Sequence, residues 1–170
     1  MSREIAAGLT VIDPDAIART MQAENPTLAA IPAARSAILM CRELVAQRAS
    51  FIVESTLAGN GAIALMTKAK QSGYRTLLIY VALGEPELHI DRVRLRVAQG
   101  GHDIPDADIR RRYFRSLSRA PEAIRLADEA IVLDNAGPKP ERVLLLRNGE
   151  ITWKSASLPS WVSEVVDRLA

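Results

Sequence analysis

The chain has 170 residues, of which 48% are hydrophobic and 25% charged, and a net charge of +2, so it is long enough to bury a core as one globular domain. It contains one cysteine, which excludes an internal disulfide, and two histidines, which argues against a metal site of the zinc type. No apolar run reaches the length of a membrane span and no signal-peptide pattern occurs, so we expect a cytoplasmic protein that does not enter membranes.

Strand-like and helix-like segments alternate along the chain. Short apolar runs predict strands, and longer segments with apolar residues three or four apart predict helices. Asp13 is expected to cap the first helix, because Pro14 suits the position directly after a cap. In chain order the expected elements are a strand at 9–12, a helix after Asp13, a helix at 29–48, a strand at 51–53, a helix at 59–72, a strand at 76–83, two helices within 86–127, a strand at 130–133, and a terminal hairpin and helix within about 142–169.

The segment from 92 to 119 concentrates the positive charge of the chain. It holds eight arginines against three acids, whereas the other residues carry a slight excess of acids. Arginine suits two-point recognition of phosphate or carboxylate oxygens, because its planar guanidinium offers paired donors. These arginines are Arg92, Arg94, Arg96, Arg110, Arg111, Arg112, Arg115 and Arg119.

Two helices separated by a glycine stop account for this segment. Gly100 and Gly101 are expected to end the first helix, and Asp106 or Asp108 to cap the second. Helical spacing places the arginines along one surface, so we predict a lid over an anionic ligand at about 86–127.

Position separates the arginines that we assign to function from those that we do not. Arg96 lies close before the glycine pair, where a lid would bend, and is assigned to function. Arg115 and Arg119 are better explained as part of a solvent-exposed basic helix face.

Continuous apolar strands separated by helices predict an α/β fold in which a parallel sheet is covered by helices on both faces. Ligands bind such sheets at the carboxyl ends of the strands. We therefore predict one site there for phosphates and a hydroxylated substrate. The polar residues that follow the expected strands are Asp13 and Asp15, Glu54 and Thr56, and Asp134 and Asn135.

Several stretches resemble the bacterial zeta-toxin-like P-loop kinases. The similarity runs from about residue 2 to residue 137, and the motifs around the glycine pair are specific rather than generic. The stretches that carry it are VIDPDAIA, FIVESTLAG, GYRTLLIYVALGEPEL, RVRLRVAQGGHDIP, DIRRRYFRSL and LDNAG. The resemblance implies a single kinase domain over 1–170 that transfers a phosphoryl group from ATP or GTP, with Mg²⁺, to a sugar hydroxyl of a UDP-linked amino sugar.

The resemblance also implies roles for individual residues. Asp15 would be the general base that takes the proton of the attacking hydroxyl, with a helix cap as the alternative role. Thr56 and Glu54, with Asp13, would lie in the substrate pocket, and Arg96 would stabilise the transferring phosphoryl group. A small antitoxin protein would be a partner. The residues expected to bind phosphate or nucleotide are His102, Arg110, Arg111, Arg112, Asp134 and Asn135.

The chain departs from the family pattern in two places. Gly101-His102 stands where toxin members place a second lid arginine, so that role passes to Arg110, Arg111 or Arg112, or lapses. No G-x-x-x-x-G-K-[ST] sequence occurs, and no lysine follows a glycine-rich turn into a helix. We therefore expect a chain that begins just after the phosphate-binding loop, an N-terminally truncated kinase fold without transferase activity of its own.

Two alternatives remain open. A relative that binds a nucleotide or sugar nucleotide without catalysis would keep the pocket and the lid. A basic nucleic-acid-binding module is less favoured, because only 4% of the residues are aromatic and stacking platforms are therefore scarce. The sequence leaves homo-oligomerisation open.

Overall fold

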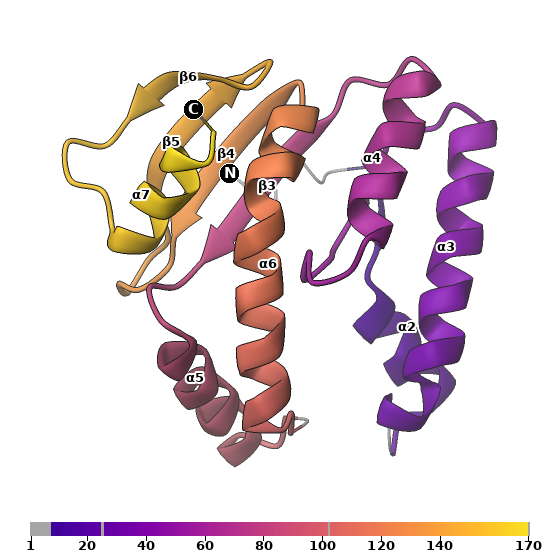
Figure 1. Ribbon diagram of the computed structural model, residues 1–170. Helices are drawn as coiled ribbons and strands as arrows, with labels where there is room; N and C mark the ends of the chain where they lie inside the picture. The colour runs from indigo at the N-terminus through magenta and orange to yellow at the C-terminus, as the bar shows by residue number, and fades with distance from the viewer. Residues whose placement is uncertain (1–7, 25, 102, 170) are drawn as a thin grey trace. The chain divides into compact units, whose positions relative to one another are not determined.

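The computed structural model describes residues 8–24, 26–101 and 103–169 and shows a mixed α/β protein (Figure 1). The chain divides into two compact units, residues 1–55 (unit 1) and 56–170 (unit 2). The elements are β1 (Thr10–Ile12), α2 (Pro14–Met21), the 3₁₀ helix η1 (Pro26–Ala29), α3 (Ala30–Ala46), β2 (Phe51–Val53), α4 (Gly61–Gln71), β3 (Leu77–Ala82), α5 (Pro86–Ala98), α6 (Asp106–Leu126), β4 (Glu129–Asp134), β5 (Glu141–Arg147), β6 (Glu150–Lys154) and α7 (Ser160–Asp167).

Unit 1 combines two short parallel strands with two helices. β1 pairs with β2 so that Thr10 lies opposite Phe51 and Ile12 opposite Val53. Helix α2 packs against α3 and η1, and α3 also contacts β1. Four-residue spacing gives α3 one buried face, as expected of a helix that packs along its length. The buried residues of this face are Ala33, Ala37, Cys41 and Val45.

Unit 2 is built on a four-stranded sheet in the order β3-β4-β5-β6. β3 and β4 are parallel, whereas β5 and β6 continue the sheet in antiparallel orientation. Asn148 and Gly149, which both have positive φ, turn the chain between β5 and β6. This is the backbone conformation that a two-residue hairpin turn requires. The predicted terminal hairpin is therefore confirmed.

Helices α6 and α7 cover one face of this sheet (Figure 1). The core beneath them includes Tyr80, Val132, Leu144 and Trp161. The other side chains of β3 point the opposite way, and Leu77, Ile79 and Val81 are 46, 40 and 47% exposed. Within the described residues of unit 2, the helices thus cover only one face of β3.

The mixed α/β class is confirmed, whereas helices on both faces of one sheet stay a prediction. Side chains of a strand alternate between the two faces, so an unbroken apolar run shows that both faces are apolar. It does not show that both are covered by helices. One domain over residues 1–170 stays a prediction.

The predicted cap of α2 is confirmed, whereas the predicted cap of α6 is wrong. Asp13 caps α2 as expected, because its side chain accepts a hydrogen bond from the N–H of Asp15. The cap position of α6 is Pro105, and no side chain caps that helix. Asp106 and Asp108 instead lie in its first turn, where a negative charge favours the positive end of the helix dipole.

None of the helices in the described ranges is both long enough and apolar enough to cross a membrane.

Candidate functional site

Asp13 and Glu54 lie at the same edge of the two-stranded sheet in unit 1. Ile12 and Val53 are partners in the parallel register, and each acid is the next residue of its chain. The N–H of Glu54 donates to the carbonyl of Ile12 at 2.9 Å, which continues the ladder by one residue. Adjacent strands lie about 4.8 Å apart, so these two predicted substrate-binding residues are neighbours.

Asp15, the predicted general base, is not a helix cap. Asp13 holds that position, with its Oδ1 2.8 Å from the N–H of Asp15 and its Oδ2 3.5 Å from Arg19. Asp15 lies in the first turn of α2 and is exposed, and its side chain makes no hydrogen bond or ion pair with any described residue. The alternative role of Asp15 as a cap is therefore excluded, and its role as a base stays a prediction.

Thr56 begins a loop with an unusual backbone. Its hydroxyl accepts a hydrogen bond from the N–H of Ala58 at 3.4 Å. The next residue, Leu57, is buried in the core of unit 2 and has a φ of 56°. A branched apolar residue rarely adopts this conformation, which costs on the order of 1–3 kcal/mol and is typical of loops shaped for a function. The positive φ of Leu57 therefore makes the loop that begins at Thr56 a candidate functional segment.

Asp134 and Asn135 lie at the carboxyl end of β4, as predicted. Asp134 pairs with Ala82 in the parallel register, and the N–H of Asn135 donates to the carbonyl of Ala82 at 2.8 Å. The Oδ1 atom of Asp134 accepts a hydrogen bond from the indole of Trp161 at 3.1 Å. Arg92 donates to the carbonyl of Asn135, which brings an arginine of α5 to this edge.

Surface ion pairs hold several of the predicted arginines. Arg94 lies 2.8 Å from Asp106, and Arg111 lies 2.9 Å from Asp108. Arg110 pairs with Glu87, and this contact joins α6 to α5. Exposed pairs of this kind contribute about 0–1 kcal/mol each, so an anionic ligand can replace the carboxylate at little cost.

The remaining arginines differ in their contacts. The side chains of Arg112 and Arg115 make no hydrogen bond or ion pair with the residues in the described ranges, and both are exposed. Arg119 donates to the Oδ1 atom of Asn60 and so ties α6 to the start of α4. This contact gives Arg119 a structural role that the sequence did not predict.

The glycine pair shapes the backbone directly after Arg96. Gly100 has a φ of 85°, and the N–H of Gly101 donates to the carbonyl of Arg96 at 2.9 Å. A Cβ atom at Gly101 would lie 2.6 Å from Cγ and 2.8 Å from the carbonyl oxygen of Arg96. Glycine is therefore required at both positions, one for its conformation and one for the close approach.

The last two predicted features are His102 and a site for a metal ion. His102 lies outside the described residues. Among the residues that are described, no three His, Cys, Asp or Glu side chains come together in a way that could hold a metal ion.

The packing between α5 and α6 includes a half-buried histidine that the sequence analysis did not single out. His89 meets the ring of Tyr113 edge-on at 5.3 Å, and its Nε2 atom is buried without a partner in the described structure. Burial and the charge of Arg92 lower the pKa of His89. The neutral imidazole is therefore favoured in the folded state.

Comparison with known proteins gives one relationship. No protein-family model matches the chain, and no solved structure matches it. A protein of Haemophilus influenzae, described as an uncharacterized protein, is 39% identical over 103 residues, which cover 61% of this chain and 74% of that protein. The chain belongs to the same family as this Haemophilus influenzae protein.

Proposed function

We propose that the chain is a phosphotransferase-type domain of the zeta-toxin-like P-loop kinase kind, which binds a sugar nucleotide or a similar small phosphorylated molecule. The observation that carries this proposal is the arrangement of arginines on α5 and α6. All six from Arg92 to Arg112 are exposed, and Arg94, Arg110 and Arg111 pair with carboxylates on the surface. A phosphorylated ligand offers more charge and better paired acceptors than these carboxylates.

The acidic residues of unit 1 suggest which chemistry the domain is suited to. Asp15 is exposed on α2, and its carboxylate is not used to cap the helix. An ionised carboxylate in this setting can accept the proton of a substrate hydroxyl. Asp13, Glu54 and Thr56 supply oxygen atoms suited to a sugar, because hydroxyl groups pair well with carboxylates and with a threonine hydroxyl.

Arg96 is the arginine that we assign to the phosphoryl group. It follows the pattern of arginines that neutralise charge on equatorial phosphate oxygens. Its place beside Gly100 and Gly101 would allow it to move with a lid. The sequence contains no phosphate-binding loop, so we expect these 170 residues to bind the acceptor ligand without measurable transfer from ATP.

A calorimetric titration of the 170-residue chain with UDP-N-acetylglucosamine tests the proposal. N-acetylglucosamine is the matched ligand, because it keeps the sugar and lacks the phosphates. We expect the nucleotide to bind at least about tenfold more tightly than the free sugar, since charge-assisted contacts to phosphate supply the difference. Equal affinity for the two ligands, or no binding of either, would contradict the proposal.

Three further measurements distinguish this proposal from a nucleotide-binding relative, a complete kinase and a nucleic-acid-binding module. UDP that binds as tightly as UDP-N-acetylglucosamine would indicate a nucleotide-binding relative without sugar recognition. Transfer from ATP and Mg²⁺ that Asp15→Asn abolishes would instead show a complete catalyst. A single-stranded DNA that binds with a steep dependence on salt would favour the nucleic-acid alternative.

A further inference from the structure

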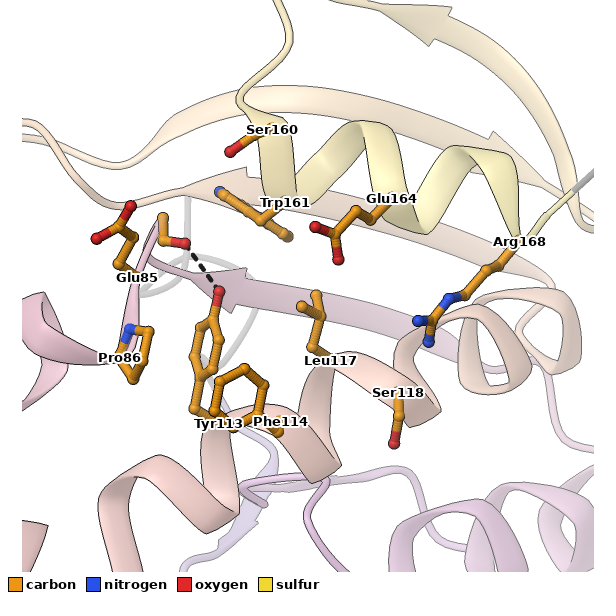
Figure 2. A pocket seen from close by; sticks show the side chains of 11 residues that line it. Glu85, Pro86, Tyr113, Phe114, Leu117, Ser118, Ser160, Trp161, Glu164 and Arg168 are labelled. Atoms are coloured by element: carbon orange, nitrogen blue, oxygen red, sulfur yellow. Dashed lines mark hydrogen bonds between the residues drawn. The ribbon is translucent and has the colours of Figure 1, made fainter. Parts of the chain in front are cut away.

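A cavity of about 440 Å³ lies in unit 2 at the carboxyl end of β3, between that strand end and helices α6 and α7 (Figure 2). This volume is in the range of pockets that hold small molecules. The lining comes from Gly84 and Glu85 after β3, from Pro86 at the start of α5, and from α6 and α7. The carboxyl end of a parallel strand is a usual place for a ligand. None of the predicted site residues lines this cavity.

Aromatic rings make up part of its wall. Tyr113, Phe114 and Trp161 are three of the seven aromatic residues of the chain. Tyr113 is fixed by a 2.8 Å hydrogen bond from its hydroxyl to the carbonyl of Gly84, and Trp161 by the 3.1 Å bond to Asp134. Phe114 is 59% exposed, and its ring meets that of Tyr113 edge-on. The ring surface that the cavity offers to a ligand therefore comes from Tyr113 and Phe114, because Trp161 is only 2% exposed and lies behind them as part of the core.

Two carboxylates line the same cavity without a partner. The side chains of Glu85 and Glu164 make no hydrogen bond or ion pair with any residue that the structure describes. Glu87, close to Glu85 in the chain, is by contrast paired with Arg110. Carboxylates without partners beside aromatic rings are what a site for an organic cation requires.

The two carboxylates also affect the pKa of Tyr113, whose ring lines the cavity. The pKa of Tyr113 is raised, first by burial and then by Tyr80 and by the charges of Glu164, Glu85 and Glu87. Burial is the larger cause of this raised pKa, and the negative field of the three glutamates adds to it. The same field favours a positively charged ligand.

Arg168 stands at the other end of the cavity. Figure 2 shows Glu85 at one side, Glu164 between, and the guanidinium of Arg168 at the opposite side. Arg125 donates to the backbone carbonyl of Arg168, which anchors the end of α7. A cation is repelled at this end and attracted at the other, so the charge distribution gives a ligand one orientation.

We propose that this cavity binds a small organic ammonium compound with an aromatic or apolar portion. Its charge lies against Glu85 and Glu164, and its apolar portion lies on Tyr113 and Phe114. The ammonium gains attraction from both the carboxylates and the faces of the rings. This site is separate from the arginines of α5 and α6, which take anions, and the inference does not rest on the proposed function.

Titration with 2-phenylethylammonium tests the site, with the fluorescence of Trp161 as the readout. The second tryptophan, Trp153, lies on β6 with Arg142 over its ring and would add a background signal. The titration is therefore run in a Trp153→Phe chain and repeated by calorimetry on the unaltered chain. The neutral 2-phenylethanol and the anionic phenylacetate are the matched ligands, because both keep the ring.

We expect millimolar binding of the ammonium compound and about tenfold weaker binding of the two matched ligands. Glu164→Gln should weaken the ammonium complex about fivefold or more, whereas Arg168→Ala should strengthen it, since a repelling charge is removed. Glu122→Gln changes an exposed acid of α6 that does not line the cavity, and it should leave the affinity within about twofold.

Three results would overturn the inference. Equal binding of the three ligands would show an apolar pocket without charge selection. Tighter binding of phenylacetate would show that Arg168 dominates and that the site takes anions. No binding of 2-phenylethylammonium to the unaltered chain by calorimetry would show that the cavity is not a site for ammonium compounds.

Discussion

Asp128 joins segments of unit 2 that are distant in the sequence. Its Oδ2 atom accepts hydrogen bonds from the N–H and the hydroxyl of Thr76, at 2.7 and 2.9 Å. Its Oδ1 atom lies 3.0 Å from the ammonium of Lys70, which also donates to the carbonyl of Leu126. These bonds, of which that from the N–H of Thr76 has the largest effect, lower the pKa of Asp128. One carboxylate thus holds the start of β3 and the ends of α4 and α6.

Replacement of Asp128 by alanine should lower the free energy of unfolding by about 2 kcal/mol, because it leaves the half-buried groups of Thr76 without their acceptor. Urea denaturation measures this difference. Asp167→Ala removes an exposed acid at the end of α7 and should cost less than about 0.5 kcal/mol. If both variants lose the same small amount, the bonds to Asp128 do not contribute to stability.

The lowered pKa of His89 makes the free energy of unfolding depend on pH. Its pKa is lower in the folded chain than in the unfolded chain, so below a pH of about 6.5 the unfolded state binds more protons. Stability contributed by neutral His89 is therefore complete above this pH and is lost as the pH falls toward the lowered pKa. The slope cannot exceed about 1.4 kcal/mol per pH unit for one proton.

The variant His89→Leu should remove most of this dependence, as measured by urea denaturation across the range from neutral to mildly acidic pH. His102→Gln changes the only other histidine of the chain and serves as the control, since it should retain the slope. The explanation fails if His89→Leu keeps the slope, or if His102→Gln removes it.

At the scale of the elements, the turn after α5 depends on two glycines. Gly101→Ala would place a Cβ atom 2.8 Å from the backbone oxygen of Arg96, and a backbone atom cannot move aside as a side chain does. We expect a loss of about 1–3 kcal/mol in stability from this overpacking. Because Arg96 itself is displaced, the affinity for UDP-N-acetylglucosamine should fall as well.

Thermal unfolding and calorimetry on the same sample check both effects of Gly101→Ala. Gly59→Ala is the matched control, because no atom lies within 4 Å of a Cβ atom at Gly59. Gly59→Ala should change neither quantity appreciably. A Gly101→Ala chain with unchanged stability and affinity would show that the turn accommodates the methyl group.

Most elements could be predicted from local patterns, but some of their ends could not. The two helices that carry the arginines and the hairpin at Asn148 and Gly149 follow directly from apolar spacing and turn residues. The start of α6 was predicted at Asp106 or Asp108, because both are good caps. Pro105 takes the cap position instead, and the two acids lie in the first turn, where their negative charge favours the positive end of the helix dipole.

At the scale of the whole molecule, long-range contacts limited what the sequence could predict. The polar ends of parallel strands were expected, and Asp13 with Glu54 and Asp134 with Asn135 lie at such ends. The use of Asp134 by Trp161, 27 residues later, depends on how α7 packs on the sheet, and no local pattern encodes that packing. The aromatic cavity was missed for the same reason.

The charges of this chain, whose net charge is +2, are unevenly distributed over the molecule. Arginines gather on α5 and α6, whereas the unpartnered acids Glu85 and Glu164 line the aromatic cavity. We propose that specific arginines on these helices bind a phosphorylated ligand. General attraction by a basic surface would make all exposed arginines about equal. A pairwise comparison of two arginines therefore separates the two explanations.

The deciding measurement is a calorimetric titration of Arg96→Ala and Arg115→Ala with UDP-N-acetylglucosamine, at one salt concentration. Both arginines are exposed, and Arg115 is the control because its position indicates a solvated helix face. We predict that Arg96→Ala weakens binding by about tenfold or more, the value of one charge-assisted contact, and that Arg115→Ala changes it by less than about twofold. Equal losses of affinity in the two variants, or an unchanged affinity of Arg96→Ala, would contradict a specific role of Arg96 in phosphate binding.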